Sequence, residues 1–341
     1  MRRILVTGGA GFIGANFIRH LLAHHDYEIV NLDKLTYAGN LENLRDIEDD
    51  KRYRFVHGDI CDEKVVAEAI KGAWGVVNLA AETHVDRSLI DVRPFIETDI
   101  HGACVVLEAA RREGVERFLH ISTDEVYGPR FPANPARETD ALAPANPYAA
   151  SKAGGEQQCL AYHRAFGLPV VVSRGANNIG PWQHPEKVLP LFISNALDDQ
   201  PLPVYGEGLQ VRDRLFVEDN CEALDLLLHQ GEPGEAYNVG AGNHRTNIEV
   251  AETVLSLLEK PHSLIRFVED RAAHDAYYAM DTSKLQALGW KPRTGYQTSL
   301  QRTIDWYRSH RDWWQRIKSG EYAAYYQRQY ADRLAHARPA D

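Results

Sequence analysis

The first half of the chain alternates short apolar runs with segments whose apolar residues recur at helical spacing. Nearly continuous apolar runs predict strands buried on both faces of a sheet: Ile4–Thr7, Glu28–Asp33, Tyr53–Val56, Gly75–Ala80, Arg117–Ser122 and Pro169–Ser173. Helical spacing predicts helices between them, over Gly14–Ala23, Glu63–Ile70, Phe95–Arg112 and Tyr148–Phe166. This alternation is typical of an α/β protein with a Rossmann-like, doubly wound parallel sheet.

The pattern changes after about residue 175, where prolines and glycines divide the chain into shorter segments. We therefore expect residues 1–175 to form the first domain and residues 176–341 to form mainly a smaller C-terminal lobe, with some chain crossing back. The aromatic residues between Trp313 and Tyr330 predict a C-terminal helix that docks its rings on the body. A tail that binds a partner is the alternative.

Composition narrows the class of protein. With 44% hydrophobic and 25% charged residues, the 341-residue chain has a globular composition, and its net charge of −10 disfavours nucleic acid and anionic membranes as partners. Nothing approaches the roughly 18 apolar residues of a membrane span. The cysteines lie far apart, which favours reduced thiols and a cytoplasmic protein: Cys61, Cys104, Cys159 and Cys221.

Histidines are numerous, and 15 of them invite a metal hypothesis. His20 and His24 stand four residues apart on the outward side of a predicted helix. No carboxylate or cysteine set lies near them at ligand spacing, so we expect solvated surface residues and no metal site.

A glycine-rich loop joins the first predicted strand to the first helix. Gly8, Gly11 and Gly14 permit a tight turn and the close approach of backbone to a pyrophosphate at the helix N-terminus. Asp33 ends the second strand, where its carboxylate would bind an adenosine ribose diol and repel a 2′-phosphate. NAD is therefore favoured over NADP, although Lys34 next to it would suit that phosphate. A glycine turn with an incidental aspartate is the structural alternative.

Two further groups of residues point to chemistry at the same edge of the sheet. Tyr148 and Lys152 share a helix face, where an ammonium would lower the pKa of the phenol and make it a base. Thr123, Asp124 and Glu125 follow the fifth strand, and two carboxylates there indicate an additional proton transfer with one acid and one base. Alone, these groups could be a surface pair and a solvated acidic turn.

Together with the glycine loop, the Tyr-x-x-x-Lys pair resembles the short-chain dehydrogenase/reductase superfamily. Eleven stretches in order along the chain resemble the nucleotide-sugar 4,6-dehydratases within it: TGGAGFIG, NLDKLTYAGN, HGDICD, AAETHVDRS, HISTDEVYG, NPYAASK, NNIGPWQHPEKVLP, LPVYGEG, VRDRLFVED, YNVGAGN and FVEDRAAHD. The Thr-Asp-Glu triplet separates these dehydratases from sugar-nucleotide epimerases.

The resemblance implies a redox-neutral reaction on dTDP-glucose that yields a 4-keto-6-deoxy sugar. Tyr148, assisted by Lys152 and Thr123, would remove the 4-hydroxyl proton while NAD accepts the C4 hydride. Glu125 would then remove the C5 hydrogen, and Asp124 would protonate the leaving 6-hydroxyl. A homodimer through a four-helix bundle is implied as well.

The resemblance also implies which residues bind the cofactor and the substrate. The implied NAD-binding residues are Gly8, Gly11, Phe12, Ile13, Gly14, Asp33, Lys34, Leu35, Thr36, Asp59, Ile60, Ala80, Ala81, Glu82, Thr98, Tyr148, Lys152 and Asn178. The implied substrate-binding residues are Thr83, His84, Thr123, Asn177, Lys187, Val188, Pro203, Val204, Tyr205, Arg212, Asn247, Arg271 and His274.

The sequence departs from the family pattern beside the implied substrate pocket. Gly175, Ala176 and Ile179 stand where the family has larger or polar residues, and Arg214 stands where it has a tryptophan. These changes leave open which nucleotide base and which sugar the substrate carries. The alternatives are a 4,6-dehydratase or 4-epimerase for a UDP- or other nucleotide-linked hexose, and a non-enzymatic NAD-sensing module.

Overall fold

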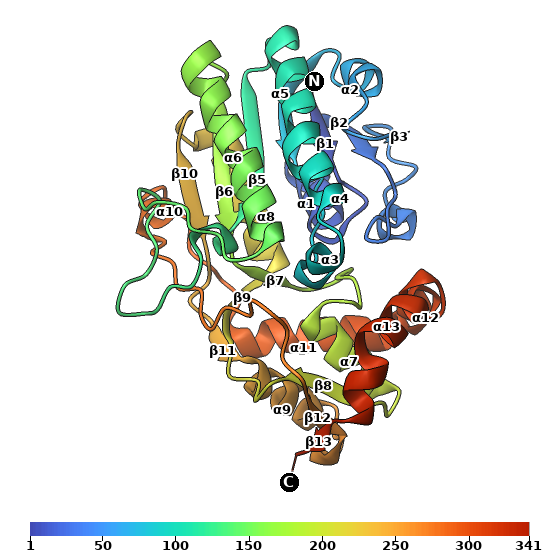
Figure 1. Cartoon of the computed structure of the whole chain (residues 1–341). Helices are drawn as coiled ribbons and strands as arrows, with labels where there is room; N and C mark the ends of the chain where they lie inside the picture. The colour runs from blue at the N-terminus through green and yellow to red at the C-terminus, as the bar shows by residue number, and fades with distance from the viewer. Residues whose placement is uncertain (341) are drawn as a thin grey trace.

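Seven parallel strands form the central sheet of the computed structural model, which describes residues 1–340 (Figure 1). Their order is β10-β6-β5-β4-β1-β2-β3, so the strand order reverses beside β1. In chain order the strands are β1 (Arg2–Thr7), β2 (Tyr27–Asp33), β3 (Tyr53–His57), β4 (Ala73–Asn78), β5 (Arg117–Thr123), β6 (Val170–Gly175) and β10 (Ala236–Val239). The doubly wound α/β fold predicted from the sequence is confirmed.

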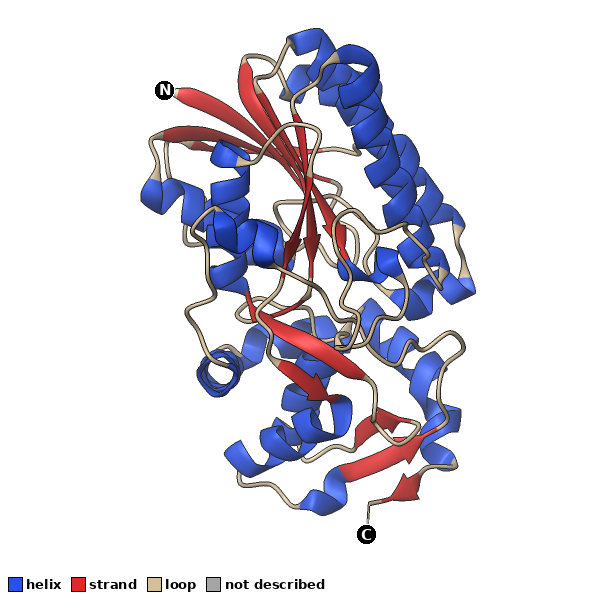
Figure 2. Cartoon of the chain, turned by 90° about the vertical axis from the view of Figure 1, so that its left-hand side faces the viewer, coloured by secondary structure: helices blue, strands red, loops and turns tan. Residues whose placement is uncertain are grey.

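Helices cover both faces of this sheet because its strands are apolar on both sides (Figure 2). One face packs against α1 (Phe12–His24) and α8 (Val217–Gln230), and the other against α2 (Glu63–Ala69), α5 (Ala103–Glu113) and α6 (Pro147–Phe166). The ends of the predicted strands and helices shift by at most two residues.

The long helix predicted over Phe95–Arg112 has a more complex form. It follows α3 (Val85–Ile90) and consists of α4 (Arg93–Phe95), a π-helical segment (η2, Ile96–Gly102) and α5. The π-helical turns lie against α6, where a Cβ on Gly155 would come within 2.2 Å of the Asp99 carbonyl oxygen. Glycine at this position therefore lets the two helices approach closely.

The chain enters a second region after β6 and crosses back to the sheet twice. It returns first as α8 and β10, the strand that pairs with β6, and later as α10 (Ser283–Ala287), which packs against β10. The other helices and strands after β6 lie below the central sheet in Figure 1. Its two three-stranded sheets are β11-β9-β7 and β13-β12-β8: β7 (Asn177–Ile179), β8 (Leu202–Tyr205), β9 (Val211–Phe216), β11 (His244–Thr246), β12 (Ile265–Val268) and β13 (Arg338–Pro339).

The helices of this lobe pack around a second apolar core. They are α7 (Val188–Leu197), α9 (Asn247–Leu257), α11 (Tyr296–Ser309), α12 (Arg311–Ser319) and α13 (Glu321–Ala335). Tyr322, Tyr325 and Tyr330 of α13 are buried, so the predicted docking of the aromatic end on the body is confirmed. Within residues 1–340, no helix has both the length and the apolar character needed to cross a membrane.

The prediction that His20 and His24 are both solvated surface residues is wrong for His20. His24 is exposed, but the His20 side chain is only 13% exposed, and its Nε2 lies 3.1 Å from Oδ2 of Asp225. Asp225 belongs to α8, which packs beside α1 on the same face of the sheet. A carboxylate about two hundred positions away cannot be placed from local sequence spacing.

Candidate active site

A cavity of about 380 Å³ lies at the carboxyl ends of the central strands and extends into the C-terminal lobe. Its size suits a small-molecule site, and ligands of doubly wound sheets bind at this edge. All site residues predicted from the sequence line the cavity except Leu35, Thr98 and Val204.

Two of the three exceptions have a structural reason. Val204 is buried in the core of the lobe, whereas its neighbours Pro203 and Tyr205 line the cavity, as expected when side chains alternate along a strand. Leu35 contributes its backbone N–H, which donates to Oδ1 of Asp33 at 2.8 Å. Thr98 lies on the π-helical segment outside the cavity lining.

The glycine loop between β1 and α1 has the geometry expected of a dinucleotide site. Gly8 has a φ of +69°, and a Cβ there would lie 2.7 Å from the Cα of Ala80. A Cβ on Gly14 would lie 2.4 Å from the Gly8 carbonyl oxygen. Gly11 caps α1 without a side-chain hydrogen bond, so the first N–H groups of the helix remain free to bind an anion. The loop therefore fits a pyrophosphate.

Asp33 is held in place at the end of β2. Its Oδ2 accepts a hydrogen bond from Ala10 N at 2.9 Å, and burial raises the pKa of the carboxyl against the effect of its two backbone donors. Lys34 does not face a free site, because its Nζ pairs with Oδ2 of Asp59 at 2.6 Å. A 2′-phosphate would meet two carboxylates here, so this end of the cavity fits NAD better than NADP.

Asp124 is the buried acid of the site. Strand β5 ends at Thr123, and Asp124 begins a short 3₁₀ helix, η3 (Asp124–Tyr127). Burial and the neighbouring Glu125 raise the pKa of Asp124 to about 8, against the opposing effects of Arg212 and of the Thr123 hydroxyl. The Asp124 carboxyl is therefore largely protonated at neutral pH and can donate a proton.

Glu125 is held by a hydrogen-bond donor from a distant part of the chain. Its Oε2 accepts from Asn146 Nδ2 at 3.2 Å, while the Tyr278 hydroxyl, 3.3 Å from the same oxygen, makes its shorter hydrogen bond to Oδ2 of Asp275 at 2.6 Å. Asn146 also caps α6, since its Oδ1 accepts from Ala149 N at 2.8 Å. The same residue thus positions the carboxylate and the helix that bears Tyr148.

The predicted lowering of the Tyr148 pKa is wrong, because the net shift is upward. Burial, followed by the charges of Glu125 and Asp99, raises the pKa of Tyr148 well above its usual value, although a hydrogen bond with Thr123 lowers it. Lys152 is buried and donates from Nζ to the Ile121 carbonyl oxygen at 2.6 Å. It therefore anchors α6 to β5 beside the tyrosine.

Several polar residues that the sequence analysis did not select close the other end of the cavity. Asp86 accepts from Arg271 Nη1 at 3.0 Å and from the Tyr205 hydroxyl at 3.2 Å. Gln329 of α13 donates to the Tyr205 hydroxyl at 2.7 Å, and Tyr330 stacks on the Tyr205 ring. Helix α13 is therefore part of the site wall. No pattern of residue spacing in the sequence indicates that α13 contacts the other elements of the site.

Arg214, where the family has a tryptophan, also lines the cavity. It is buried, with its Nη2 donating to Oδ1 of Asn247 at 2.8 Å. Its Nε has no hydrogen-bond partner among residues 1–340, and burial lowers the pKa of the guanidinium to about 10. A buried cation with an unused donor suits an anionic group of a ligand.

Comparisons with known proteins place these features in a family. Residues 5–303 match the family model described as GDP-mannose 4,6 dehydratase. A dTDP-glucose 4,6-dehydratase of Streptomyces niveus is 47% identical over 327 residues, covering 94% of this chain and 97% of that protein.

Solved structures agree with this match. DesIV, a dTDP-glucose 4,6-dehydratase of Streptomyces venezuelae crystallised with NAD, has a TM-score of 0.91 at 44% identity, covering 93% of this chain and all of that one. A UDP-glucose 4-epimerase of Thermus thermophilus in complex with NAD has a TM-score of 0.84 at 33% identity, with coverage of 90% and 99%.

Proposed function

The chain belongs to the GDP-mannose 4,6-dehydratase family, and from this premise we propose its function. It is an NAD-dependent hydro-lyase that converts dTDP-glucose to dTDP-4-keto-6-deoxyglucose. The observation that carries this function is the buried pair of Asp124, with its pKa raised to about 8, and Glu125. An epimerase has no water to eliminate, and an NAD sensor needs neither an acid nor a base.

NAD fits the glycine loop, Asp33 and the Lys34–Asp59 pair, and when bound it accepts the hydride from C4 of the sugar and returns it to C6. Tyr148 would act as the phenolate, a form that the positive charges of bound NAD and of Lys152 would favour against the effect of burial, and would take the proton of the 4-hydroxyl beside Thr123. Lys152 holds the helix turn that presents Tyr148. The resulting 4-ketone acidifies the hydrogen on C5.

Elimination then uses the two carboxyl groups. Glu125, held by Asn146, takes the C5 proton, and Asp124 gives its proton to the 6-hydroxyl. The C6–O bond breaks and water leaves. A proton returns to C5 when hydride reaches C6, so one water is lost and the sugar undergoes no net oxidation.

The nucleoside diphosphate occupies the part of the cavity bounded by the C-terminal lobe. Arg212, Arg271 and Lys187 line this part and supply cationic donors for two phosphates. Tyr205 and Tyr330 offer aromatic faces to the base. In this arrangement residues 1–175 bind NAD and carry the catalytic groups, while residues 176–341 mainly bind the nucleotide sugar.

We also propose that the enzyme is a cytoplasmic homodimer, formed through the helices α5 and α6 of each copy as a four-helix bundle. Apolar side chains are exposed along the segment that leads into α5: Leu89 41%, Ile90 57%, Val92 38% and Ile96 48%. Exposed apolar residues grouped on one segment favour a protein interface. Ile96→Glu should yield monomers in light scattering, whereas Phe131→Glu, at another exposed position, should not.

Assay of the purified protein with dTDP-, UDP-, GDP- and CDP-glucose tests the proposed function. We expect dTDP-glucose to be the best substrate and its product to have lost one water. A product of unchanged mass with inverted C4 would instead show an epimerase, and binding of NAD without turnover of any sugar would show a sensing module.

A further inference from the structure

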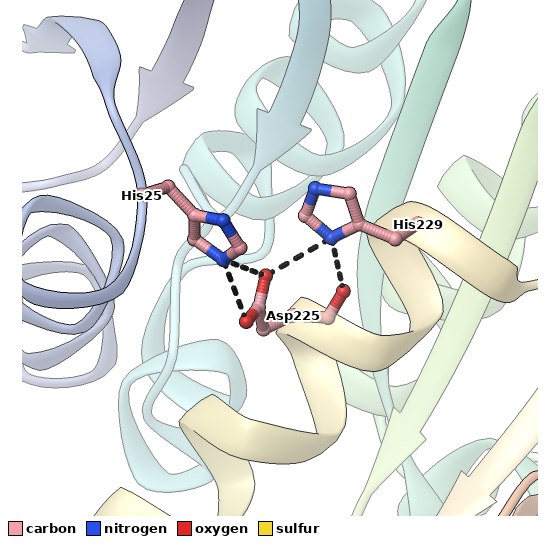
Figure 3. A group of neighbouring side chains, drawn as sticks. All are labelled: His25, Asp225 and His229. Atoms are coloured by element: carbon pink, nitrogen blue, oxygen red, sulfur yellow. Dashed lines mark hydrogen bonds and ion pairs between the residues drawn. The ribbon is translucent and has the colours of Figure 1, made fainter.

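A group of histidines surrounds Asp225 at the opposite end of the sheet from the active site. His25 lies between α1 and β2, while Asp225 and His229 are one turn apart on α8. Figure 3 shows the ring nitrogens of His25 and His229 converging on the Asp225 carboxylate. The cluster lies beside the start of β2, whereas the cavity lies at the carboxyl ends of the strands. The cluster therefore plays no part in the chemistry of the cavity.

The distances in this cluster suit a metal ion. His25 Nε2 lies 2.9 Å from both oxygens of Asp225, and His229 Nδ1 lies 3.0 Å from its Oδ1. The three ligand atoms lie within 4.8 Å of one another. A tetrahedral zinc ion with bonds of about 2.0–2.2 Å needs ligand atoms roughly 3.3 Å apart. The imidazole–carboxylate distances are already close to this value, and the ligand atoms, all within 4.8 Å of one another, would need to move by no more than about 1.5 Å.

Neighbouring side chains hold the ligands in this arrangement. The Tyr27 hydroxyl lies 2.6 Å from His229 Nε2, and the Tyr27 ring stacks on His25. His229 Nδ1 faces Asp225, 2.8 Å from its backbone carbonyl oxygen and 3.0 Å from its Oδ1, so a metal ion would replace the first of these contacts. His20 Nε2 lies 3.1 Å from the other carboxylate oxygen. Such partners of the outer atoms of metal ligands fix their orientation and tautomer.

The cluster is also open enough to exchange an ion. The side chains of His25, Asp225 and His229 are 27%, 19% and 25% exposed. Two neutral imidazoles and one carboxylate form a donor set typical of Zn²⁺, with a fourth position for water. If the cluster were only an ion pair of Asp225 with a histidine, one of these imidazoles would be enough.

We propose that His25, Asp225 and His229 form a binding site for a divalent transition metal of the zinc type, with His20 positioning Asp225. A bound ion would join the end of α1 to α8 across one face of the sheet. Its effect would therefore be to stabilise the fold without changing the reaction.

Titration of chelator-treated full-length protein with Co²⁺ and Zn²⁺ tests this site. We expect one ion per chain, visible absorption bands of protein-bound Co²⁺, and a higher melting temperature with Zn²⁺. His229→Gln and His25→Gln should each weaken binding at least about tenfold, while dehydratase activity persists. His262→Gln is the matched control, because His262 faces a single carboxylate, that of Glu252, at 3.4 Å on the surface.

Equal Co²⁺ affinity in His229→Gln, His25→Gln and His262→Gln would overturn the proposal, as would an unchanged melting temperature in the presence of Zn²⁺. Retained activity shows that the variants are folded, so weaker binding cannot be ascribed to unfolding. The readouts are metal stoichiometry and melting temperature, and neither depends on the substrate assigned to the cavity.

Discussion

Asn146 donates from Nδ2 to Oε2 of Glu125 at 3.2 Å while its Oδ1 accepts from the N–H of Ala149 in the first turn of α6. One side chain therefore couples the position of a carboxylate after β5 to the start of the helix that bears Tyr148. Its two roles, helix cap and orientation of Glu125, can be separated by substitution.

Asn146→Ser should retain the cap but not the contact with Glu125, because the serine side chain is shorter. We expect its melting temperature to stay near that of the wild type, with turnover reduced on the order of tenfold or more. Asn146→Ala should lose the cap as well, at about 0.5–2 kcal/mol of stability. Thermal unfolding and steady-state kinetics measure both, and full activity in Asn146→Ser would show that Asn146 does not position Glu125.

The two carboxyl variants should fail after the first hydride transfer. Asp124→Asn cannot protonate the leaving hydroxyl and Glu125→Gln cannot take the C5 proton, so each should lose about 10²- to 10⁴-fold in turnover. Both should still accumulate NADH on addition of substrate, which its absorbance reports, whereas Tyr148→Phe should not.

Heavy water distinguishes the two roles. Asp124→Asn should still exchange the C5 hydrogen for deuterium, and Glu125→Gln should not. Exchange at the wild-type rate in Glu125→Gln would assign the base to another residue.

The raised pKa of Asp124 makes a prediction about pH and stability. Its pKa is about 8 in the folded protein against 3.8 for an unperturbed aspartate, so the native state binds the extra proton between these values. The contribution of Asp124 to stability therefore decreases as pH rises from about 4 to 8. Glu125 and Asp213 raise this pKa, and Arg212 lowers it.

Asp124→Asn lacks this titration. Its free energy of unfolding, relative to that of the wild type, should increase between pH 5 and pH 8 in urea titrations. In the wild type, turnover should decline above about pH 8 as the acid loses its proton. An unchanged difference in stability across this range would mean that Asp124 is already ionised at pH 5.

The fold, and the gathering of the proposed catalytic residues at one cavity, could be predicted because their signals are local. The glycine loop, the Tyr-x-x-x-Lys spacing and the Thr-Asp-Glu triplet each occupy one turn or strand end, and the parallel sheet brings them to one edge. Contacts between distant segments could not be predicted. Gln329 reaches Tyr205 only through the docking of α13, and Asp225 meets His20 and His25 only because α8 packs beside α1.

The direction of the Tyr148 pKa could not be predicted from spacing either. Lys152 follows Tyr148 by one helical turn, but its Nζ is taken up by the Ile121 carbonyl. Burial and the carboxylates of Glu125 and Asp99 then dominate. Helical spacing fixes which residues share a face, whereas the surrounding charges depend on the whole fold.

Arg214→Trp should change the recognition of the nucleotide. If the unused Arg214 donor binds an anionic group of the substrate, its loss costs about 1.5–3 kcal/mol, or on the order of tenfold or more in KM with little change in kcat. The ratio of kcat/KM for dTDP-glucose to that for UDP-glucose should shift as well. Arg293→Trp, at a position 78% exposed and outside the cavity, is the control. Identical profiles for the two variants would show that Arg214 is only structural.

The central claim is that hydride leaves C4 and returns to C6 of the same sugar while one water is lost. Incubation of the protein with dTDP-glucose deuterated at C4, followed by mass spectrometry and NMR of the product, tests it most directly. We expect a product one water lighter, with the deuterium at C6 and no net consumption of NAD. Deuterium retained at C4 of a sugar of unchanged mass, or lost to the solvent, would contradict it.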